Sequence, residues 1–545
     1  MISTSLNRGI WHIAREYGGI AEAGGIKDVV AGLAESQARE GRPVTAVLLR
    51  YGFINLENLA ARRLPLALTL KLPGQNEPSP STTVRVKIYR CERQGLRIFL
   101  LDSARTRSKG AVYTYTAREE QEDPARKRGT GHWDAHHLNL ILQRGALELA
   151  YRFKEKPAIF HCHDGHAAFL PAMMREISPY KVFFKQTRAL ITIHNAGMGY
   201  HQEIHDFKFA RQLTGLPEKV LKKGILNQAV DPLLLGGFYA AVNTVSEAYA
   251  SEINSGRQDD LTGGLGRAYE QAGMKLRGIT NGIDPRPFDP RFPADSGLAH
   301  AFNPLAGRME GKSLIRSELL STLAEVYRAD PARQAGADFA SKGSKDCIRG
   351  LTRFGALTAG LDSPLYTFIG RLTSQKGVNI LTRAVSRLFS RSTELQLLIL
   401  GQGEQGIEEE LSSLCKKLKA EGRLAVLIGY NPDMAKMIYA AGDFFLVPSR
   451  YEPCGLTVFF AQMMGNLPIV HRVGGLIMVR DGFNGYSYGE HSARALTEAV
   501  CRSLDDYRQN PQKLELMRKQ AFQEVLSRYT WDRVMRKYLA LYQDA

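Results

Sequence analysis

Two cations stand just after a short apolar run in the second half of the chain. The segment FIGRLTSQKG covers residues 368–377 and places Arg371 and Lys376 on the turn between a predicted strand and a predicted helix. Cations beside a helix N-terminus suit a diphosphate, and they can neutralise charge on a departing phosphate group. The alternative is a solvent-exposed basic loop, which the isolated Arg-x4-Lys spacing does not exclude.

A second segment combines a carboxylate with the predicted start of a helix. It reads PSRYEPCGLT over residues 448–457, where two prolines bracket Glu452 and a helix is expected to begin near Gly455. Backbone N–H groups at that helix start would suit phosphate, and the carboxylate would suit sugar hydroxyls. The alternative is a helix cap with a favourable acidic residue.

Polar residues also follow two predicted strands of the first half. HDGH covers residues 163–166, and ITIHNAG covers residues 191–197. Because side chains at the carboxyl ends of parallel strands line ligand sites in such folds, we expect Asp164, His166 and His194 to do so. A metal is the alternative that His163, Asp164, His166 and His194 suggest, but His-x-x-His between two strands lacks an obvious third ligand, so we favour hydrogen bonding to a sugar. A lone histidine in such a place is more often structural.

The segment EAGGIKDV, residues 22–29, places Gly24 and Gly25 before a predicted helix. Glycines there would let the backbone approach a ligand closely. An isolated Gly-Gly pair more often marks a tight turn, which is the alternative.

Short apolar runs alternate with helical patterns, and this alternation predicts parallel sheets covered on both faces. In the second half a helix is expected over Val378–Leu388, and Ile407, Leu411, Leu414 and Leu418 form one stripe of another. The predicted strands are Tyr366–Ile369, Leu395–Leu400, Leu424–Ile428, Phe444–Val447 and Leu467–Val470, and in the first half Val44–Leu49, Ala158–His161, Ala189–His194 and Ala240–Val245.

Two α/β halves joined near Gly282–Pro290 are the simplest architecture. Two segments depart from the pattern: 104–131 is polar and rich in turn residues, which predicts a mobile surface excursion, and 325–350 is interpreted as a second insertion. A ligand is expected in a cleft beyond the carboxyl ends of the strands.

Composition narrows the function classes. The 545 residues are 44% hydrophobic and 23% charged, which is typical of a soluble protein with two or more domains. The formal net charge is +17, but the cations are dispersed, with the densest cluster at 126–128, so neither nucleic acid nor a membrane is an expected partner. Six scattered cysteines, no long apolar run and no visible secretory signal predict a cytoplasmic protein.

Taken together, these segments resemble the bacterial glycogen/starch synthase family over nearly the whole chain. That family carries Lys-x-Gly-Gly, HxHDWH, TIHN, TVS, NGID, SRLTxQKG, PSRFEPCGLT and TGGL in order. This chain has EAGG, HCHDGH, TIHN, TVS, NGID, GRLTSQKG, PSRYEPCGLT and VGGL, and the match over 366–476 is highly specific. YTWDRVMRKYLALY, residues 529–542, resembles the family's last helix, which crosses back onto the first domain.

The resemblance implies a retaining glycosyltransferase of the GT-B type, α/β with two Rossmann-like parallel-sheet domains facing a central cleft. The implied domains are an acceptor-side domain over 1–280, a nucleotide-sugar domain over 281–522 and the returning helix over 523–545. It implies that glucose passes from a nucleotide-glucose, ADP-glucose favoured, to an α-1,4-glucan. The family needs no metal or other cofactor, and domain closure would exclude water.

The resemblance also assigns roles to residues. Arg371 and Lys376 would bind the donor diphosphate, Glu452 would lie against the donor glucose or its ribose, and His194 would hold the glucose at the reacting centre. Asp164 and His166 are expected to line the same cleft. The remaining donor-binding residues implied are Gly24, Gly25, Asn281, Cys454, Gly455, Leu456 and Thr457.

Two positions depart from the family pattern. Glu22 stands where the family has its donor-binding lysine, and a carboxylate there would repel a diphosphate; Lys27 is a possible substitute. Gly165 replaces the tryptophan of HxHDWH, which removes a packing surface. The alternatives are therefore a degenerate paralogue that binds glucan or nucleotide with little transfer, and a related transferase that uses UDP-glucose.

Overall fold

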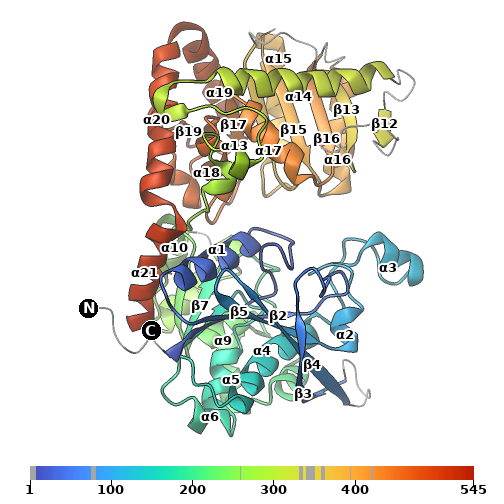
Figure 1. The fold of residues 1–545 in the computed structure, drawn as a ribbon, viewed down its shortest axis with the longest axis vertical. Helices are drawn as coiled ribbons and strands as arrows, with labels where there is room; N and C mark the ends of the chain where they lie inside the picture. Colours follow the sequence, from blue (N-terminus) through green and yellow to red (C-terminus); the bar gives the residue numbers. More distant parts are fainter. Residues whose placement is uncertain are drawn as a thin grey trace. The chain divides into compact units, whose positions relative to one another are not determined.

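The computed structural model describes residues 8–74, 81–257, 259–329, 335–338, 350–357, 363–392, 394–418 and 422–544. The chain forms two compact units (Figure 1): unit 1 is Met1–Gly282 with Trp531–Ala545, and unit 2 is Ile283–Thr530. Each unit has its own sheet. The boundaries expected from the sequence were at 280 and 522.

The sheet of unit 1 is parallel through most of its width. Its order is β11-β10-β7-β6-β1-β2-β5-β4-β3, and β1 pairs with both β2 and β6, so the strand order reverses between β1 and β6. At one edge, β4 runs antiparallel to β5 and pairs with β3 in an antiparallel hairpin. The strands are β1 Ile10–Ile13, β2 Val44–Leu49, β3 Arg62–Leu72, β4 Thr82–Arg93, β5 Leu96–Asp102, β6 Ile159–His163, β7 Arg188–Ile193, β10 Ala241–Thr244 and β11 Arg277–Gly278; β8 Ile225–Leu226 and β9 Ala229–Val230 pair separately.

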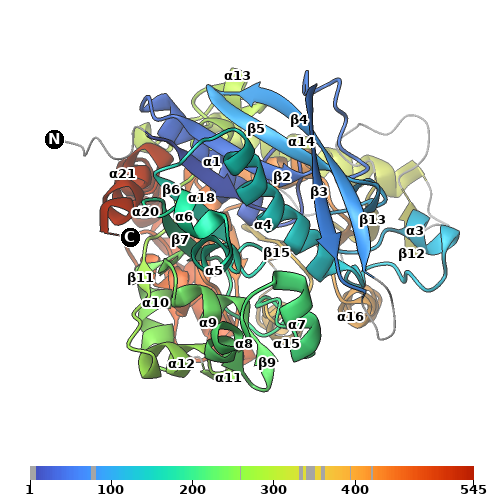
Figure 2. The same cartoon turned by 90° about the horizontal axis from the view of Figure 1, so that it is seen from below.

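Helices cover both faces of this sheet (Figures 1 and 2), with α1 and α21 on one side and α4 and α5 on the other. Gly32 of α1 admits the indole of Trp531 in α21, because a Cβ at Gly32 would lie 1.9 Å from the indole nitrogen. The helices of unit 1 are α1 Ile26–Arg39, α2 Ala104–Arg107, α3 Ala117–Glu122, α4 Ala135–Arg152, α5 Leu170–Glu176, α6 Tyr180–Phe183, α7 Phe207–Thr214, α8 Glu218–Leu221, α9 Pro232–Gly237, α10 Glu247–Asn254, α11 Asp259–Thr262, α12 Leu265–Gln271 and α21 Trp531–Asp544.

The sheet of unit 2 has the order β12-β13-β16-β15-β14-β17-β18-β19, and it is parallel from β16 to β19. The order reverses between β14 and β17, which makes the carboxyl ends of these two strands the expected ligand edge. The strands are β12 Ala335–Asp338, β13 Thr352–Leu357, β14 Leu365–Ile369, β15 Gln396–Gly401, β16 Arg423–Ile428, β17 Phe444–Val447, β18 Leu467–His471 and β19 Tyr486–Tyr488.

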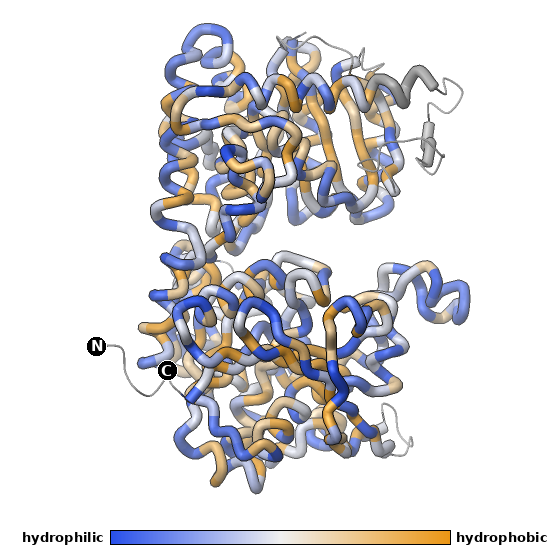
Figure 3. Tube along the Cα trace, in the orientation of Figure 1, coloured by the Kyte–Doolittle hydropathy of each residue, from blue (hydrophilic) through white to orange (hydrophobic). Residues whose placement is uncertain are grey.

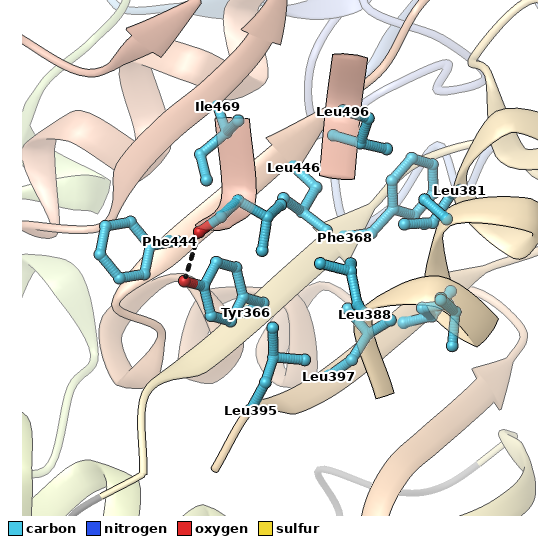
Figure 4. Close-up of a cluster of buried hydrophobic side chains, with 14 of the residues drawn as sticks. Tyr366, Phe368, Leu381, Leu388, Leu395, Leu397, Phe444, Leu446, Ile469 and Leu496 are labelled. Atoms are coloured by element: carbon cyan, nitrogen blue, oxygen red, sulfur yellow. Dashed lines mark hydrogen bonds between the residues drawn. The ribbon is translucent and has the colours of Figure 1, made fainter. Parts of the chain in front are cut away.

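Two apolar layers enclose this second sheet. Tyr366 and Phe368 of β14 face the layer of α15, α16 and α19 (Figure 4), and Leu365 faces the layer of α14, α17 and α18. The strands are therefore hydrophobic on both faces (Figure 3), as a covered parallel sheet requires. The helices are α13 Pro293–Ser296, α14 Glu310–Ala329, α15 Val378–Arg391, α16 Gln405–Lys417, α17 Pro432–Ala441, α18 Leu456–Met463, α19 Ala493–Gln509 and α20 Pro511–Arg528.

The predicted strands of both halves are present within one or two residues of the expected bounds. The segment 104–131 was expected to be a mobile excursion, but it holds α2 and α3, and each of these helices begins with a capping box. Most of the predicted insertion 325–350 lies outside the described residues. No helix among the described residues combines the length and apolar character needed to cross a membrane.

Candidate active site

The two motif loops of unit 2 meet at the place where its strand order reverses. One loop joins β14 to α15 and carries Arg371 and Lys376; the other joins β17 to α18 and carries Glu452. The ammonium of Lys376 lies 2.5 Å from Oε2 of Glu452, which is 7% exposed and also accepts a hydrogen bond from the Ser449 hydroxyl at 3.1 Å. The cation and the carboxylate predicted from separate motifs thus form one group.

Backbone contacts fix the two loops to each other. The Arg450 N–H donates to the Gln375 carbonyl at 2.9 Å, and the Gln375 amide donates to the Tyr451 carbonyl at 3.4 Å. Gly377 has φ +71°, and a Cβ there would lie 1.9 Å from the Pro448 carbonyl oxygen. The glycine is therefore required for the close approach that brings Lys376 to Glu452.

Arg371 is exposed, and its guanidinium donates a long 3.3 Å hydrogen bond to Gln375. Among the described residues it forms no ion pair. An uncompensated guanidinium beside a Lys–Glu pair at a sheet edge can bind an anion, and a diphosphate is the ligand that suits two neighbouring cations.

The start of α18 is the third part of this group. Gly455 precedes the helix with φ +88°, and no side chain caps the N-terminus, so the backbone N–H groups of Leu456 and Thr457 face outward from an uncapped helix start. Gly475 of VGGL packs on Cys454, since a Cβ there would lie 2.2 Å from the Cys454 carbonyl oxygen. The Gly475 N–H donates to the Glu452 carbonyl at 2.9 Å, which ties this turn to the same loop.

In unit 1 the corresponding edge lies at the carboxyl ends of β1, β6 and β7. Asp164 follows β6 with φ +58°, and its carboxylate accepts the His194 N–H at 2.6 Å. Burial raises the pKa of Asp164 to about 7, although the backbone N–H groups of His194 and Asn195 oppose the shift. Asp164 therefore orders the turn after β7 that carries His194, rather than projecting freely.

The side chain of His194 ends a chain of buried imidazoles. Its Nε2 lies 3.0 Å from Nδ1 of His163, whose Nε2 lies 3.1 Å from Nδ1 of His12, and Nε2 of His12 bonds to the Gln37 amide oxygen at 2.8 Å. Burial lowers the pKa of His194 to about 3 and that of His12 to about 4, so the rings are neutral.

A neutral imidazole donates through one nitrogen and accepts through the other. The orientation of the Gln37 amide therefore sets the direction of every bond in the chain. With its oxygen toward His12, as in the structure, Nε2 of His194 is the donor, and Nδ1 of His194 is left as an acceptor with no hydrogen bond to a described residue. Nδ1 of His194 can then accept a hydrogen bond from a sugar hydroxyl.

The histidines also form the one group of at least three potential metal ligands found among the described residues. Nitrogens of His12, His161 and His163 lie within 4.8 Å of one another. All six of their ring nitrogens already have hydrogen-bond partners, because His161 bonds to Tyr542 at 2.8 Å and to Thr192 at 2.6 Å. A metal would have to displace this network, and the expectation that none is needed stays a prediction.

His166 and Asn281 also lie near this edge, and they differ in the contacts of their side chains. His166 is stacked on Tyr113 with ring centroids 5.0 Å apart, and burial lowers its pKa well below the usual value. Asn281 is 2% exposed, and its amide oxygen is buried without a hydrogen-bond partner among the described residues. A buried polar atom of this kind is costly unless water or a ligand completes it.

The donor contact expected of Gly24 and Gly25 stays a prediction, and the structure shows the contacts that this loop makes within the chain. Neither Gly24 nor Gly25 has a positive φ, and the Gly24 N–H donates to the Glu16 carboxylate at 2.6 Å. This N–H group is thus occupied within the chain. The Glu22 carboxylate accepts the Gly19 N–H at 2.7 Å, and Lys27 forms an ion pair with Asp28 at 2.8 Å.

Glu16 and Arg15 are the functional candidates that the sequence reasoning missed. Glu16 is 1% exposed, accepts the Tyr113 hydroxyl at 2.8 Å and sits at the end of β1, where the strand order reverses. Arg15 is 2% exposed and donates to Tyr51 at 2.7 Å. An adjacent Arg-Glu pair after the apolar run of β1 was the available signal, because charged residues at a strand end require partners.

Gly165, which replaces the family's tryptophan, has no room for any side chain. A Cβ there would lie 2.0 Å from the His201 carbonyl oxygen. His201 is itself fixed by the Asp231 carboxylate at 2.5 Å and by the Ala196 carbonyl at 2.9 Å. The backbone at His201 therefore fills the space beside residue 165.

Comparison with known proteins is consistent with this geometry. Residues 9–270 match the model described as starch synthase catalytic domain, and residues 363–506 match glycosyl transferases group 1. The chain is 27% identical over 549 residues to a glycogen synthase of Aeromonas hydrophila and 29% identical over 549 residues to one of Flavobacterium johnsoniae, covering 98% of each chain in both cases.

The fold is similar to the catalytic domain of starch synthase IV from Arabidopsis thaliana, a structure bound to ADP and acarbose, with a TM-score of 0.77 at 24% identity over 98% of both chains. The expected fold class, α/β of the GT-B type, is confirmed, with antiparallel strands added at one edge of each sheet. Three findings agree: the motif loops of unit 2, the two matched models, and the relatives aligned over almost their full length. The chain therefore belongs to the glycogen/starch synthase family of glycosyltransferases.

Proposed function

We propose that this protein is a retaining glucosyltransferase that extends the non-reducing end of an α-1,4-glucan from a nucleotide-glucose, ADP-glucose favoured, in glycogen biosynthesis. The observation that carries the proposal is the group formed by Arg371, Lys376 and Glu452 at the ligand edge of unit 2. The relatives named glycogen synthase, and the starch synthase structure bound to ADP and acarbose, support the same donor and acceptor classes.

The chemistry assigned to unit 2 is binding and release of the diphosphate. As the bond from glucose to the diphosphate breaks, negative charge grows on the departing oxygen. Arg371 and Lys376 stabilise that charge more than they stabilise the intact donor, which is the condition for raising turnover. The backbone N–H groups of Leu456 and Thr457 add donors that need no reorganisation. Glu452 orients Lys376 and accepts a sugar hydroxyl.

The chemistry assigned to unit 1 is orientation of the glucose. His194 presents a neutral ring with Nδ1 available, and the Asn281 amide oxygen lacks a partner among the described residues. Both can bond to glucose hydroxyls without introducing a charge. Asp164 fixes the His194 backbone, so its contribution is positional.

A second candidate, a degenerate paralogue that binds glucan or nucleotide with little transfer, is favoured by one observation. Glu22 replaces the family's donor-binding lysine and is held by the Gly19 N–H, while Lys27 is engaged with Asp28. If the loop meets the donor, Glu22→Lys should raise turnover about tenfold to a hundredfold. If Lys27 serves instead, Lys27→Ala should abolish turnover and Glu22→Lys should change little.

The deciding experiment follows nucleoside diphosphate release from ADP-glucose or UDP-glucose with glycogen as acceptor. Release that depends on glycogen and is lost in Arg371→Ala and Lys376→Ala would support the synthase. Turnover only with UDP-glucose would favour the related transferase. A silent wild type that Glu22→Lys restores would favour the degenerate paralogue. Release that persists in both cation variants would refute the assigned diphosphate site.

A further inference from the structure

A basic pocket in unit 1 lies apart from the residues assigned to catalysis. It has a volume of about 400 Å³, and four of its lining side chains are the cations Arg8, Arg175, Lys185 and Arg188; Gln186 and Tyr542 also contribute. None of the lining residues is acidic, and among the described residues none of the four cations forms an ion pair. Positive charge is therefore concentrated in a cavity whose described lining supplies no carboxylate.

The pocket is at the opposite end of the strands from His194. Arg188 begins β7, whereas His194 follows that strand. Six residues of parallel strand span about 20 Å. A ligand in this pocket would therefore be separate from the groups of unit 1 that are assigned to glucose.

Backbone carbonyls hold three of the cations in place. Arg8 donates to the Gln186 carbonyl at 3.2 Å, Arg175 to the Phe184 carbonyl at 2.7 Å, and Arg188 to the Gln543 carbonyl at 2.6 Å. These acceptors are neutral, so each guanidinium is oriented while its charge stays uncompensated. A guanidinium has five N–H donors, which leaves donors for a further acceptor.

We propose that this pocket binds a phosphorylated small molecule. Oriented guanidinium groups bind phosphate through paired, charge-assisted hydrogen bonds, and a lysine adds a mobile point charge. The volume lies within the range of about 300–1,000 Å³ that small-molecule sites occupy, so it accommodates more than a bare phosphate ion. The proposal does not depend on the proposed transfer reaction.

Calorimetric titration tests the pocket, with inorganic phosphate as the first probe at constant ionic strength. The titration uses the full chain carrying Arg371→Ala and Lys376→Ala, so that the cations of unit 2 do not contribute. One saturable site per chain is expected to remain. Arg8→Ala and Lys185→Ala, each added to this background, should weaken binding about tenfold, because each substitution removes one charged contact. Both side chains are exposed, so neither substitution disturbs the core.

The matched control is Lys127→Ala with Arg128→Ala, which removes two exposed cations from another surface of unit 1. It should leave phosphate binding unchanged. Ribose 5-phosphate should bind at least as tightly as phosphate, and ribose should not bind. The proposal is overturned by absence of saturable binding, by equal weakening in the control, by unchanged affinity in both pocket variants, or by failure of ribose 5-phosphate to bind.

Discussion

Replacing one buried histidine should change how the stability of unit 1 depends on pH. His12 is fully buried, with its two nitrogens bonded to His163 and Gln37, and burial lowers its pKa from 6.5 to about 4. At a pH between these two pKa values, His12 binds a proton in the unfolded chain but not in the folded chain. Stability therefore falls as the pH drops below 6.5, and it is fully retained above that value.

The magnitude follows from the two pKa values. At about pH 5 the solution is one and a half units below the unfolded value, and each unit is worth about 1.36 kcal/mol, so His12 alone costs about 2 kcal/mol. His12→Gln keeps a polar group of similar reach but cannot titrate. Relative to the wild type, its loss of stability between pH 7.5 and pH 5 should be about 2 kcal/mol smaller. The raised pKa of Asp164 changes stability with pH in the opposite direction, but the wild type and the variant share this residue.

Tryptophan fluorescence makes the measurement specific to unit 1. All three tryptophans, Trp11, Trp133 and Trp531, belong to that unit, so urea titrations followed by their emission report its unfolding. His205→Gln, which removes an exposed imidazole of the same unit, is the control and should follow the wild type. An identical pH dependence in His12→Gln and wild type would refute the inference that His12 is held neutral.

Three further predictions concern the site. Arg371→Ala and Lys376→Ala should each lower turnover about tenfold to a hundredfold, and the Arg371 variant should leave unfolding unchanged, since that side chain is exposed. Turnover should survive exhaustive chelation; loss with EDTA and recovery with zinc or manganese would show that the buried histidines hold a metal. Gly165→Ala should destabilise unit 1 by about 1–3 kcal/mol, because its Cβ meets the His201 carbonyl; unchanged urea unfolding by tryptophan emission would contradict this packing.

The strands and motif loops of unit 2 were predictable because their signals are local. Each buried strand is a continuous apolar run, and the cation and carboxylate motifs follow such runs directly. The strand order itself cannot be read from the runs. The contact between Lys376 and Glu452, which are 76 residues apart, depends on that order, because β14 and β17 are neighbours only once the sheet is assembled.

The edge hairpin of unit 1 escaped prediction for physical reasons. β3 carries Pro65 and changes register between Arg63 and Ala67, so its alternation is interrupted.

The short strand β1 also lacked a local signal. It has only four residues and includes a histidine, and nothing in its sequence shows that His12 bonds to a residue 151 positions later. The imidazole chain to His194 is thus a product of strand pairing.

The two departures from the family pattern have different consequences in the structure. The loss of the tryptophan at Gly165 is a change of packing that the chain completes elsewhere, because the His201 backbone occupies the space and the His201 ring is hydrogen-bonded at both of its nitrogens. Glu22 is a change of charge, and its bond to the Gly19 N–H satisfies one oxygen without supplying a cation to the loop. Packing can be restored by a neighbouring segment, but a missing positive charge is restored only by another cation. The donor contact proposed for this loop would therefore have to come from Lys27, whereas the packing beside Gly165 is already completed by His201.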